Sequence, residues 1–246
     1  MLEQAIREVG AFTTYSSSVY RIVETQEYAA TTGLVDSLEE QDILEQMLDT
    51  VKPGYRPETE SLHYLISTPF RYPPLKHGSR FGDTTMASFF YASEQLATSL
   101  AEFAFYRFAF FNDMSVAYEQ AVRSEHMSFS VRVRSSKLAD LTQVVSEGIS
   151  QQLTSPLQYN FSQQVGRQLL ANGALVLRYK SARCDEGINL AVAMPSEIVS
   201  RTPQDHIHWI CLSTADKISI NAQGHSPRYF NIKQFLIKGV LPRLAS

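Results

Sequence analysis

GSRFGDTTMASFFYASEQLATSLAE, residues 78–102, is the most informative stretch of the chain, because its three parts follow different patterns. The first part is a loop that carries a glycine at each end. The run Ala87–Ala92 (ASFFYA) is apolar and aromatic, which predicts a buried strand. Ser93 then suits the N-cap of a helix that continues to about Phe111. We therefore expect a loop, a strand and a helix in direct succession.

Three side chains of this stretch suit one polar pocket: Arg80 precedes the strand, Tyr91 lies near its end, and Glu102 lies on the helix. An arginine can bind a phosphate or a carboxylate through two hydrogen bonds, and a tyrosine ring can stack on a planar base. A carboxylate suits cleavage of an N-glycosidic bond, because that reaction passes through an oxocarbenium-like state. The alternative is a surface arginine, a core tyrosine and an exposed glutamate. The spacing alone leaves both interpretations open.

Helical patterns occur in several other parts of the chain. Ser37 and Glu40 have capping-box spacing ahead of an apolar stripe, which predicts a helix there. Asn172-Gly173 is a typical end for another helix. The predicted helices are Leu38–Val51, Ser115–Ser124, Asn160–Ala171 and Ile232–Val240.

Strand patterns dominate the second half, while Thr68–Thr85, with three prolines, predicts a long and functional loop. The predicted strands are Ser18–Glu24, Met127–Arg134, Ala174–Lys180, Ile188–Met194, Ile207–Ser213 and Lys217–Ile220. They do not alternate strictly with helices. We therefore expect an α+β fold with a mixed or antiparallel β core and flanking helices.

The composition is that of a folded protein of one domain, residues 1–246, since 44% of the residues are hydrophobic and 19% are charged. The formal net charge of −3 gives no basic footprint for nucleic acid. Cys184 and Cys211 form no disulfide framework and fit a reducing cytoplasm. There is no signal-peptide pattern at the N-terminus and no apolar run long enough for a membrane span. We expect a cytoplasmic protein.

Two further groups of residues invite a functional interpretation. Ser181 follows a predicted strand and could bind a ribose or a phosphate, or could simply cap a turn. His206 and His208 share one face of a strand near Cys211, but the ligand set is incomplete and the spacing matches no strong metal motif. We therefore expect no metal. The GxSxG, GxGxxG and GxxxxGK[ST] motifs are all absent.

The order of these elements resembles that of the RES-domain family, named for its arginine, glutamate and serine. The matching elements cover about Tyr15 to Met194, and a PFRYPP stretch at Pro69–Pro74 resembles a longer branch of that family. They are VYRIVE with Arg21, GSRFG with Arg80, SFFYAS with Tyr91, SLAE with Glu102, YKSAR with Ser181, and GINLAV with Asn189.

The resemblance implies the toxin half of a bacterial type II toxin–antitoxin pair, with a fold like that of ADP-ribosyltransferase toxins. Such toxins degrade NAD by hydrolysis or phosphorolysis, and some ADP-ribosylate a protein. NAD is then a substrate, and no cofactor is implied. The partner implied is an antitoxin with an Xre-like helix-turn-helix that covers the pocket, and a homodimer is plausible.

Roles for single residues come only from this resemblance. Arg80 would bind the NAD phosphates or the nicotinamide ribose, Tyr91 would stack on nicotinamide, and Glu102 would stabilise the oxocarbenium ion. Supporting positions in the NAD pocket would be Ser181, Arg21 and Asn189.

Two segments lie outside the core of the short family members: a helical insertion at about 36–67 and a C-terminal extension at about 195–246. Three functions stay open. The first is an NAD glycohydrolase or phosphorylase, the second is an ADP-ribosyltransferase that modifies a host protein, and the third is an inactive binding or regulatory protein.

Overall fold

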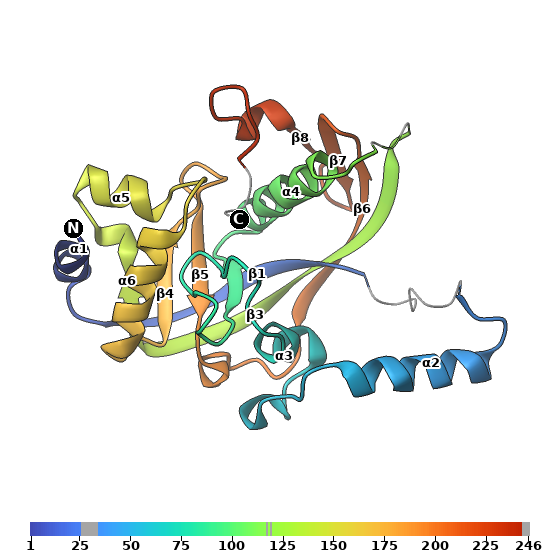
Figure 1. Cartoon of the computed structure of the whole chain (residues 1–246), viewed down its shortest axis with the longest axis horizontal. Coiled ribbons are helices and arrows are strands. Elements are labelled where there is room, and N and C mark those ends of the chain that lie inside the picture. The colour runs from blue at the N-terminus through green and yellow to red at the C-terminus, as the bar shows by residue number, and fades with distance from the viewer. Residues whose placement is uncertain (26–33, 117, 119, 243–246) are drawn as a thin grey trace.

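Eight strands form one mixed sheet in this computed structural model, in the order β1-β2-β5-β4-β3-β6-β7-β8 (Figure 1). The structure describes residues 1–25, 34–116, 118 and 120–242. β3 and β4 pair in parallel, and the other neighbours pair antiparallel. The strands are β1 (Thr13–Glu24), β2 (Phe90–Ser93), β3 (Val122–Asp140), β4 (Val176–Lys180), β5 (Ile188–Val192), β6 (Gln204–Ser213), β7 (Lys217–Asn221) and β8 (Arg228–Asn231).

One part of the sheet closes on itself. β1 pairs with both β2 and β3, and the pairings continue from β2 to β5, from β5 to β4 and from β4 to β3. The long β3 makes this closure possible, because its C-terminal end pairs with β4 while its middle pairs with β1. The short β2 is thereby enclosed between β1 and β5.

Helices flank the sheet on several sides (Figure 1). α1, α5 and α6 share one hydrophobic cluster with β4, α3 packs on a second cluster over β1–β3, and α4 packs against β6 and β7. The α+β fold with a mixed sheet and flanking helices is thus confirmed. The helices are α1 (Leu2–Val9), α2 (Leu38–Val51), α3 (Tyr64–Arg71), α4 (Leu96–Asn112), α5 (Glu147–Leu153) and α6 (Asn160–Ala171), with short 3-10 turns at Pro57–Thr59, Leu141–Gln143, Pro195–Glu197 and Ile232–Phe235.

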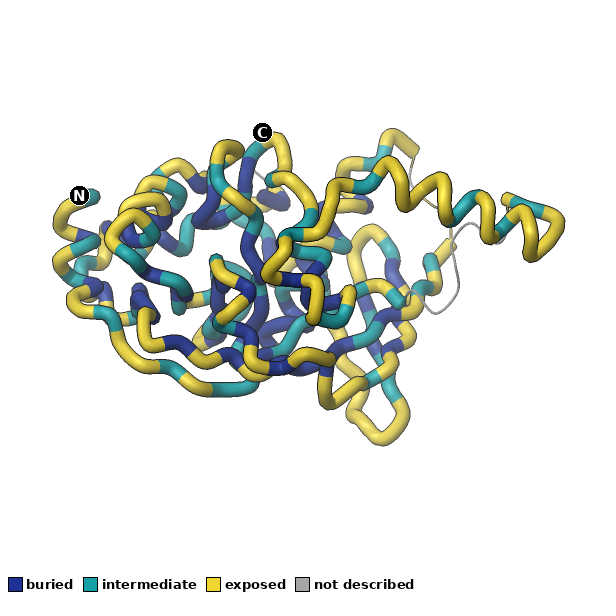
Figure 2. The backbone as a smooth tube through the Cα atoms, turned by 90° about the horizontal axis from the view of Figure 1, so that it is seen from below, coloured by how far each residue is buried: buried dark blue, intermediate teal, exposed yellow. Residues whose placement is uncertain are grey.

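α2 has the predicted bounds, and the Ser37 side chain accepts a hydrogen bond from the Glu40 amide as predicted. Its apolar stripe, however, has no buried residue, and Ile43 and Val51 are 58% and 78% exposed. Figure 2 shows α2 extending away from the body of the molecule. α2 is therefore stabilised by its cap and its helix propensity, not by packing.

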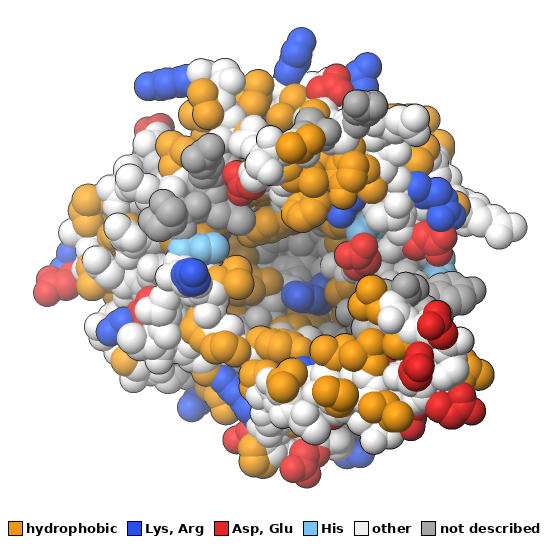
Figure 3. Space-filling view, turned by 45° about the vertical axis from the view of Figure 1, so that its right-hand side comes forward, with side chains coloured by type: hydrophobic (Ala, Val, Ile, Leu, Met, Phe, Trp, Pro, Cys, Tyr) orange, Lys and Arg blue, Asp and Glu red, His pale blue; other side chains and the backbone are white. Residues whose placement is uncertain are grey.

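The surface in Figure 3 is hollowed, with hydrophobic side chains along the rim and a basic side chain inside.

Several predicted elements are wrong or have different ends. The described residues of Ser115–Ser124 contain no helix, because β3 already begins at Val122 and pairs there with β6; residues 117 and 119 lie outside the described part. The predicted loop Thr68–Thr85 begins inside α3. The predicted helix Ile232–Val240 is only a short 3-10 turn, Ile232–Phe235.

The predicted N-cap is also wrong. Ser93 ends β2, and α4 begins at Leu96 with Gln95 as its N-cap. Ser93 stays in the strand because it is opposite Tyr20 of β1 and Asn189 of β5, so the sheet continues through it. None of the described helices is long and apolar enough to cross a membrane.

Candidate functional site

A cavity of about 420 Å³ lies between strands β1, β2, β4 and β5 and the part of α4 between Ser99 and Tyr106. The loop ahead of β2 and Tyr159, which directly precedes α6, complete the wall of this cavity. Five of the six predicted site residues line this cavity, and the sixth, Ser181, contacts one of them. The five are Arg21, Arg80, Tyr91, Glu102 and Asn189.

Glu102 is held by two hydrogen bonds to the same oxygen. Ser181 Oγ donates to Glu102 Oε1 at 2.6 Å, and Asn189 Nδ2 donates to it at 2.7 Å. No described residue donates a hydrogen bond to Oε2. Since Ser181 and Asn189 come from the end of β4 and from β5, the sheet fixes the carboxylate of a helical residue. One oxygen is anchored, and the other is available to a ligand.

Arg80 is buried beside the cavity, where its Nη1 donates to the carbonyl oxygens of Leu153 and Ser155, each at 3.0 Å. Its guanidinium lies 4.8 Å from the ring centroid of Tyr159. These contacts leave other guanidinium N–H groups to bind an anion, since arginine carries five donors. The arrangement fixes the cation at the cavity wall.

Tyr91 reaches back to the loop that precedes its strand. Its hydroxyl donates to Ser79 Oγ at 2.8 Å and accepts from the Phe81 amide at 3.2 Å. Burial raises the pKa of Tyr91 to about 12, so the hydroxyl is protonated at neutral pH. Tyr91 thus connects the loop that carries Arg80 to the sheet, and it also lines the cavity.

Arg21 supports the site from β1. Its Nη1 donates to the Tyr91 carbonyl oxygen at 2.7 Å, and its guanidinium lies 5.3 Å from the centroid of the Phe90 ring. Burial lowers the pKa of Arg21 to about 10, so it stays charged at neutral pH. It holds the backbone of β2 in place and adds positive charge to the cavity.

Sequence reasoning missed Arg183 and Ser93. Arg183 lines the cavity, its Nη2 donates to the Pro156 carbonyl oxygen at 3.1 Å, and burial lowers its pKa. Its position two residues after Ser181 was the only signal for it. Ser93 also lines the cavity, and its hydroxyl donates to Asn189 Oδ1 at 2.7 Å.

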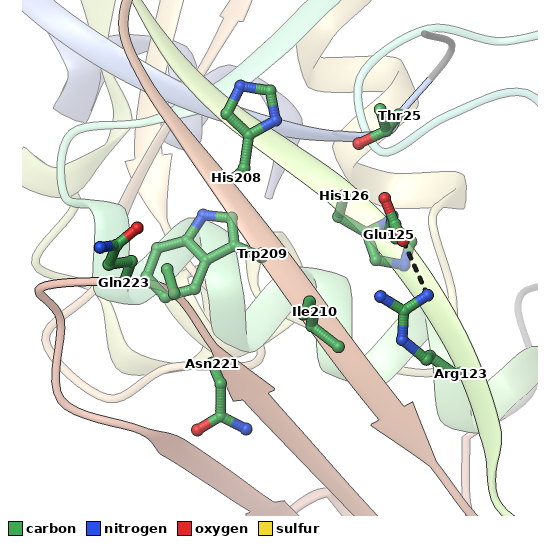
Figure 4. Close-up of a pocket in the computed structure, with 10 residues that line it drawn as sticks. Thr25, Arg123, Glu125, His126, His208, Trp209, Ile210, Asn221 and Gln223 are labelled. Carbon is green, nitrogen blue, oxygen red and sulfur yellow. Dashed lines mark ion pairs between the residues drawn. The ribbon is translucent and has the colours of Figure 1, made fainter. Parts of the chain in front are cut away.

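A second cavity, of about 340 Å³, lies over β3, β6 and β7 (Figure 4). It contains His208 and an ion pair in which Arg123 Nη1 lies 2.7 Å from Glu125 Oε1. None of the six predicted site residues lines it. Among the described residues, no group of three or more His, Cys, Asp or Glu side chains could hold a metal ion, so His206 and His208 form no such site there.

Residues 54–211, more than half of the chain, match the family model of the RES domain. This chain belongs to the RES-domain family. The RES match includes five predicted site residues and excludes Arg21, which lies upstream of it. Those included are Arg80, Tyr91, Glu102, Ser181 and Asn189.

This chain is also similar to a chain of the M. tuberculosis MbcT–MbcA toxin–antitoxin complex. The similarity covers 87% of this chain and 95% of that chain, with a TM-score of 0.49 and 11% sequence identity. This similarity is too distant to transfer function to the RES chain. No curated protein matches the chain in sequence.

Proposed function

We propose that this RES-domain protein cleaves NAD at the bond between nicotinamide and ribose, and that it acts as the toxin of a toxin–antitoxin pair. The observation that carries the proposal is the Glu102 carboxylate, which Ser181 and Asn189 fix through one oxygen beside the cavity. The RES domain supports the same function.

The charges around the cavity suit a dinucleotide. The described residues of its lining include three arginines, Arg21, Arg80 and Arg183, and among these described residues Glu102 is the one carboxylate. An excess of cations favours a ligand with a diphosphate, because arginine binds phosphate oxygens through charge-assisted hydrogen bonds. The aromatic rings of Tyr91 and Tyr159 offer surfaces for a planar base. We assign the arginines to the diphosphate and Tyr91 to the nicotinamide.

Glu102 has the chemical role in this proposal. As the bond between C1 of the ribose and the nicotinamide nitrogen breaks, nicotinamide leaves with the electron pair, and positive charge develops on the ribose. A fixed carboxylate stabilises that charge more than it stabilises the bound substrate, which lowers the barrier. Water or inorganic phosphate then bonds to C1 and loses a proton to solvent, which gives ADP-ribose or its 1-phosphate.

Incubation of the purified protein with NAD, with and without inorganic phosphate, tests the proposal. We expect free nicotinamide in both cases for a hydrolase, and release that depends on phosphate for a phosphorylase. If NAD is labelled in its ADP-ribose part and the label stays attached to a protein, the enzyme is instead an ADP-ribosyltransferase that uses the same cavity. Failure to release nicotinamide under all these conditions would overturn the proposed activity.

The proposal extends to a partner. The partner of such a toxin is an antitoxin, and we propose that it is an Xre-like helix-turn-helix protein that covers the cavity. We also propose that both proteins act in the cytoplasm. Addition of such an antitoxin is expected to stop nicotinamide release. Sedimentation of the chain alone will show whether it forms a homodimer.

Arg183→Gln is expected to raise the KM for NAD by about tenfold to a hundredfold, the effect of losing one hydrogen bond to a charged group. The physical reason is the loss of one cation that faces the diphosphate. Steady-state kinetics of nicotinamide release measure it. Arg123→Gln is the matched control, because Arg123 is a partly exposed arginine on the other cavity. Equal KM values for wild type and Arg183→Gln would contradict the assignment.

A further inference from the structure

Ser93 occupies a position that the sheet fixes on both sides. It is the last residue of β2, lies opposite Asn189 of β5 in an antiparallel pair, and lies opposite Tyr20 of β1. Directly opposed residues place their side chains on the same face of a sheet. Ser93 and Asn189 are each only 4% exposed. Their side chains therefore meet in a setting that excludes most solvent.

A chain of hydrogen bonds runs from Ser93 to the carboxylate. Ser93 Oγ donates to Asn189 Oδ1 at 2.7 Å, and Asn189 Nδ2 donates to Glu102 Oε1 at 2.7 Å. The two ends of the asparagine amide thus have different partners, an O–H donor and a carboxylate acceptor. This pattern fits only one orientation of the amide.

We propose that Ser93 is a positioning residue for Glu102 and acts through Asn189, an inference that rests on the proposed NAD cleavage. The Ser93 hydroxyl holds the amide with Nδ2 toward the carboxylate. In the reversed orientation, Oδ1 would face Glu102 Oε1, and two oxygens with partial or full negative charge would repel each other. Without Ser93, Oδ1 loses the donor that holds it, and only the contact with Glu102 still favours the productive orientation.

Ser93 and Ser181 have different roles in this proposal. Ser181 donates directly to Glu102 Oε1, so its loss removes one of the two hydrogen bonds. Ser93 does not contact Glu102, and its proton is already donated to Asn189. If Ser93 instead bound substrate through its hydroxyl, its effect would be independent of Asn189. That difference can be measured.

A double-mutant cycle on nicotinamide release tests the path of action. Ser93→Ala is expected to lower kcat by about tenfold to a hundredfold, the size of effect that misplacing a reacting group produces, with little change in KM. Asn189→Ala is expected to lower kcat at least as much. The double variant should lose no more than Asn189→Ala alone, because residues that act as one unit are not additive.

The control is Ser128→Ala, since Ser128 is a buried serine that accepts a hydrogen bond from Trp209 and does not line the first cavity. It is expected to keep the wild-type kcat. If Ser93→Ala does not fold, Ser93→Cys replaces it in the cycle, because a thiol fills similar space and is a much weaker donor.

A second measurement does not depend on activity. The side-chain amide of Asn189 gives a pair of NMR signals, which are assigned by their loss in Asn189→Asp. In Ser93→Ala, we expect both signals to shift and their exchange with water to become at least about tenfold faster, since the amide is held less firmly. Ser128→Ala should leave these signals unchanged.

The outcomes are distinct. Additive losses in the cycle, a wild-type kcat in Ser93→Ala, or unchanged Asn189 amide signals would each overturn the positioning role. If the wild-type protein releases no nicotinamide, the proposed function fails, and the amide signals alone decide whether Ser93 orients Asn189.

Discussion

Glu102→Gln is expected to lower kcat for nicotinamide release by about a hundredfold to a thousandfold, the usual effect of removing one electrostatic stabiliser of a transition state. Ser181 and Asn189 both donate to Oε1. The glutamine carbonyl oxygen can take the place of Oε1 and keep both bonds, so its amide nitrogen replaces Oε2. The substitution therefore removes the charge and preserves the geometry. The KM for NAD should change little.

Glu39→Gln is the matched control for this prediction, because Glu39 lies in the exposed first turn of α2. Steady-state kinetics of the three proteins measure the effect, and thermal unfolding checks that Glu102→Gln is folded. Expression in bacteria adds a readout for toxicity. Equal toxicity of wild type and Glu102→Gln, with no nicotinamide release by either protein, would favour a binding or regulatory protein over an enzyme. An equal and measurable kcat would instead exclude Glu102 from the catalytic step.

The local part of the candidate site could be predicted because it lies in one continuous stretch. A loop, the strand that follows it and the helix after that stay close in space, so a pocket shared by Arg80, Tyr91 and Glu102 could be predicted as one of two interpretations of this stretch. They line one cavity. Their roles in NAD cleavage stay predictions, because the residues supply a cation, a ring and a carboxylate, while NAD itself is implied by the family.

The distant part of the site could not be predicted from local pattern. Ser181 is 79 positions from Glu102 in the chain. Its local pattern fits a ligand-binding serine or a turn cap, and only the family resemblance placed it in the same pocket as Glu102. Ser93 was interpreted as a helix cap, because serine before an apolar helical run is typical of one. The strand order sets which strands are neighbours, and the register sets which residues lie opposite each other. In the pair of β2 and β5, the register places Ser93 opposite Asn189. A single sequence does not contain that information.

The incorrect helix at Ser115–Ser124 has a similar cause. Its residues have moderate helix propensity, but Val122 and Ser124 pair with Ser213 and Cys211 of β6. Tertiary pairing overrides a weak local preference. The helix Leu38–Val51 was predicted correctly for the opposite reason, because its described residues are not buried and its cap acts locally.

The position of Arg80 depends on close contact between its loop and α6. Ser162 Oγ donates to the Arg80 carbonyl oxygen at 2.6 Å, and Gln163 Nε2 donates to the Ser79 carbonyl oxygen at 3.0 Å. One turn further along, Gly166 faces Phe81. A Cβ atom at Gly166 would lie 2.2 Å from the Phe81 carbonyl oxygen. The helix can approach the loop this closely only because residue 166 has no side chain.

Gly166→Ala is therefore expected to lower the free energy of unfolding by about 1–3 kcal/mol, the typical cost of overpacking a core. Helix propensity alone predicts the opposite sign, since alanine stabilises a helix interior by about 1 kcal/mol relative to glycine. The destabilisation by the clash should exceed the gain in helix propensity, because the atom in contact belongs to the backbone of Phe81. Phe81 is fully buried and cannot move without moving Arg80. We also expect the KM for NAD to rise as Arg80 shifts.

Gly148→Ala is the matched control for Gly166→Ala. Gly148 lies in α5, and a Cβ atom there would meet nothing within 4 Å. Propensity then acts alone, so this variant should be as stable as wild type or more stable by up to about 1 kcal/mol. Urea unfolding of the three proteins measures both effects. A Gly166→Ala protein as stable as Gly148→Ala would show that the loop of Arg80 is not fixed by its contact with α6.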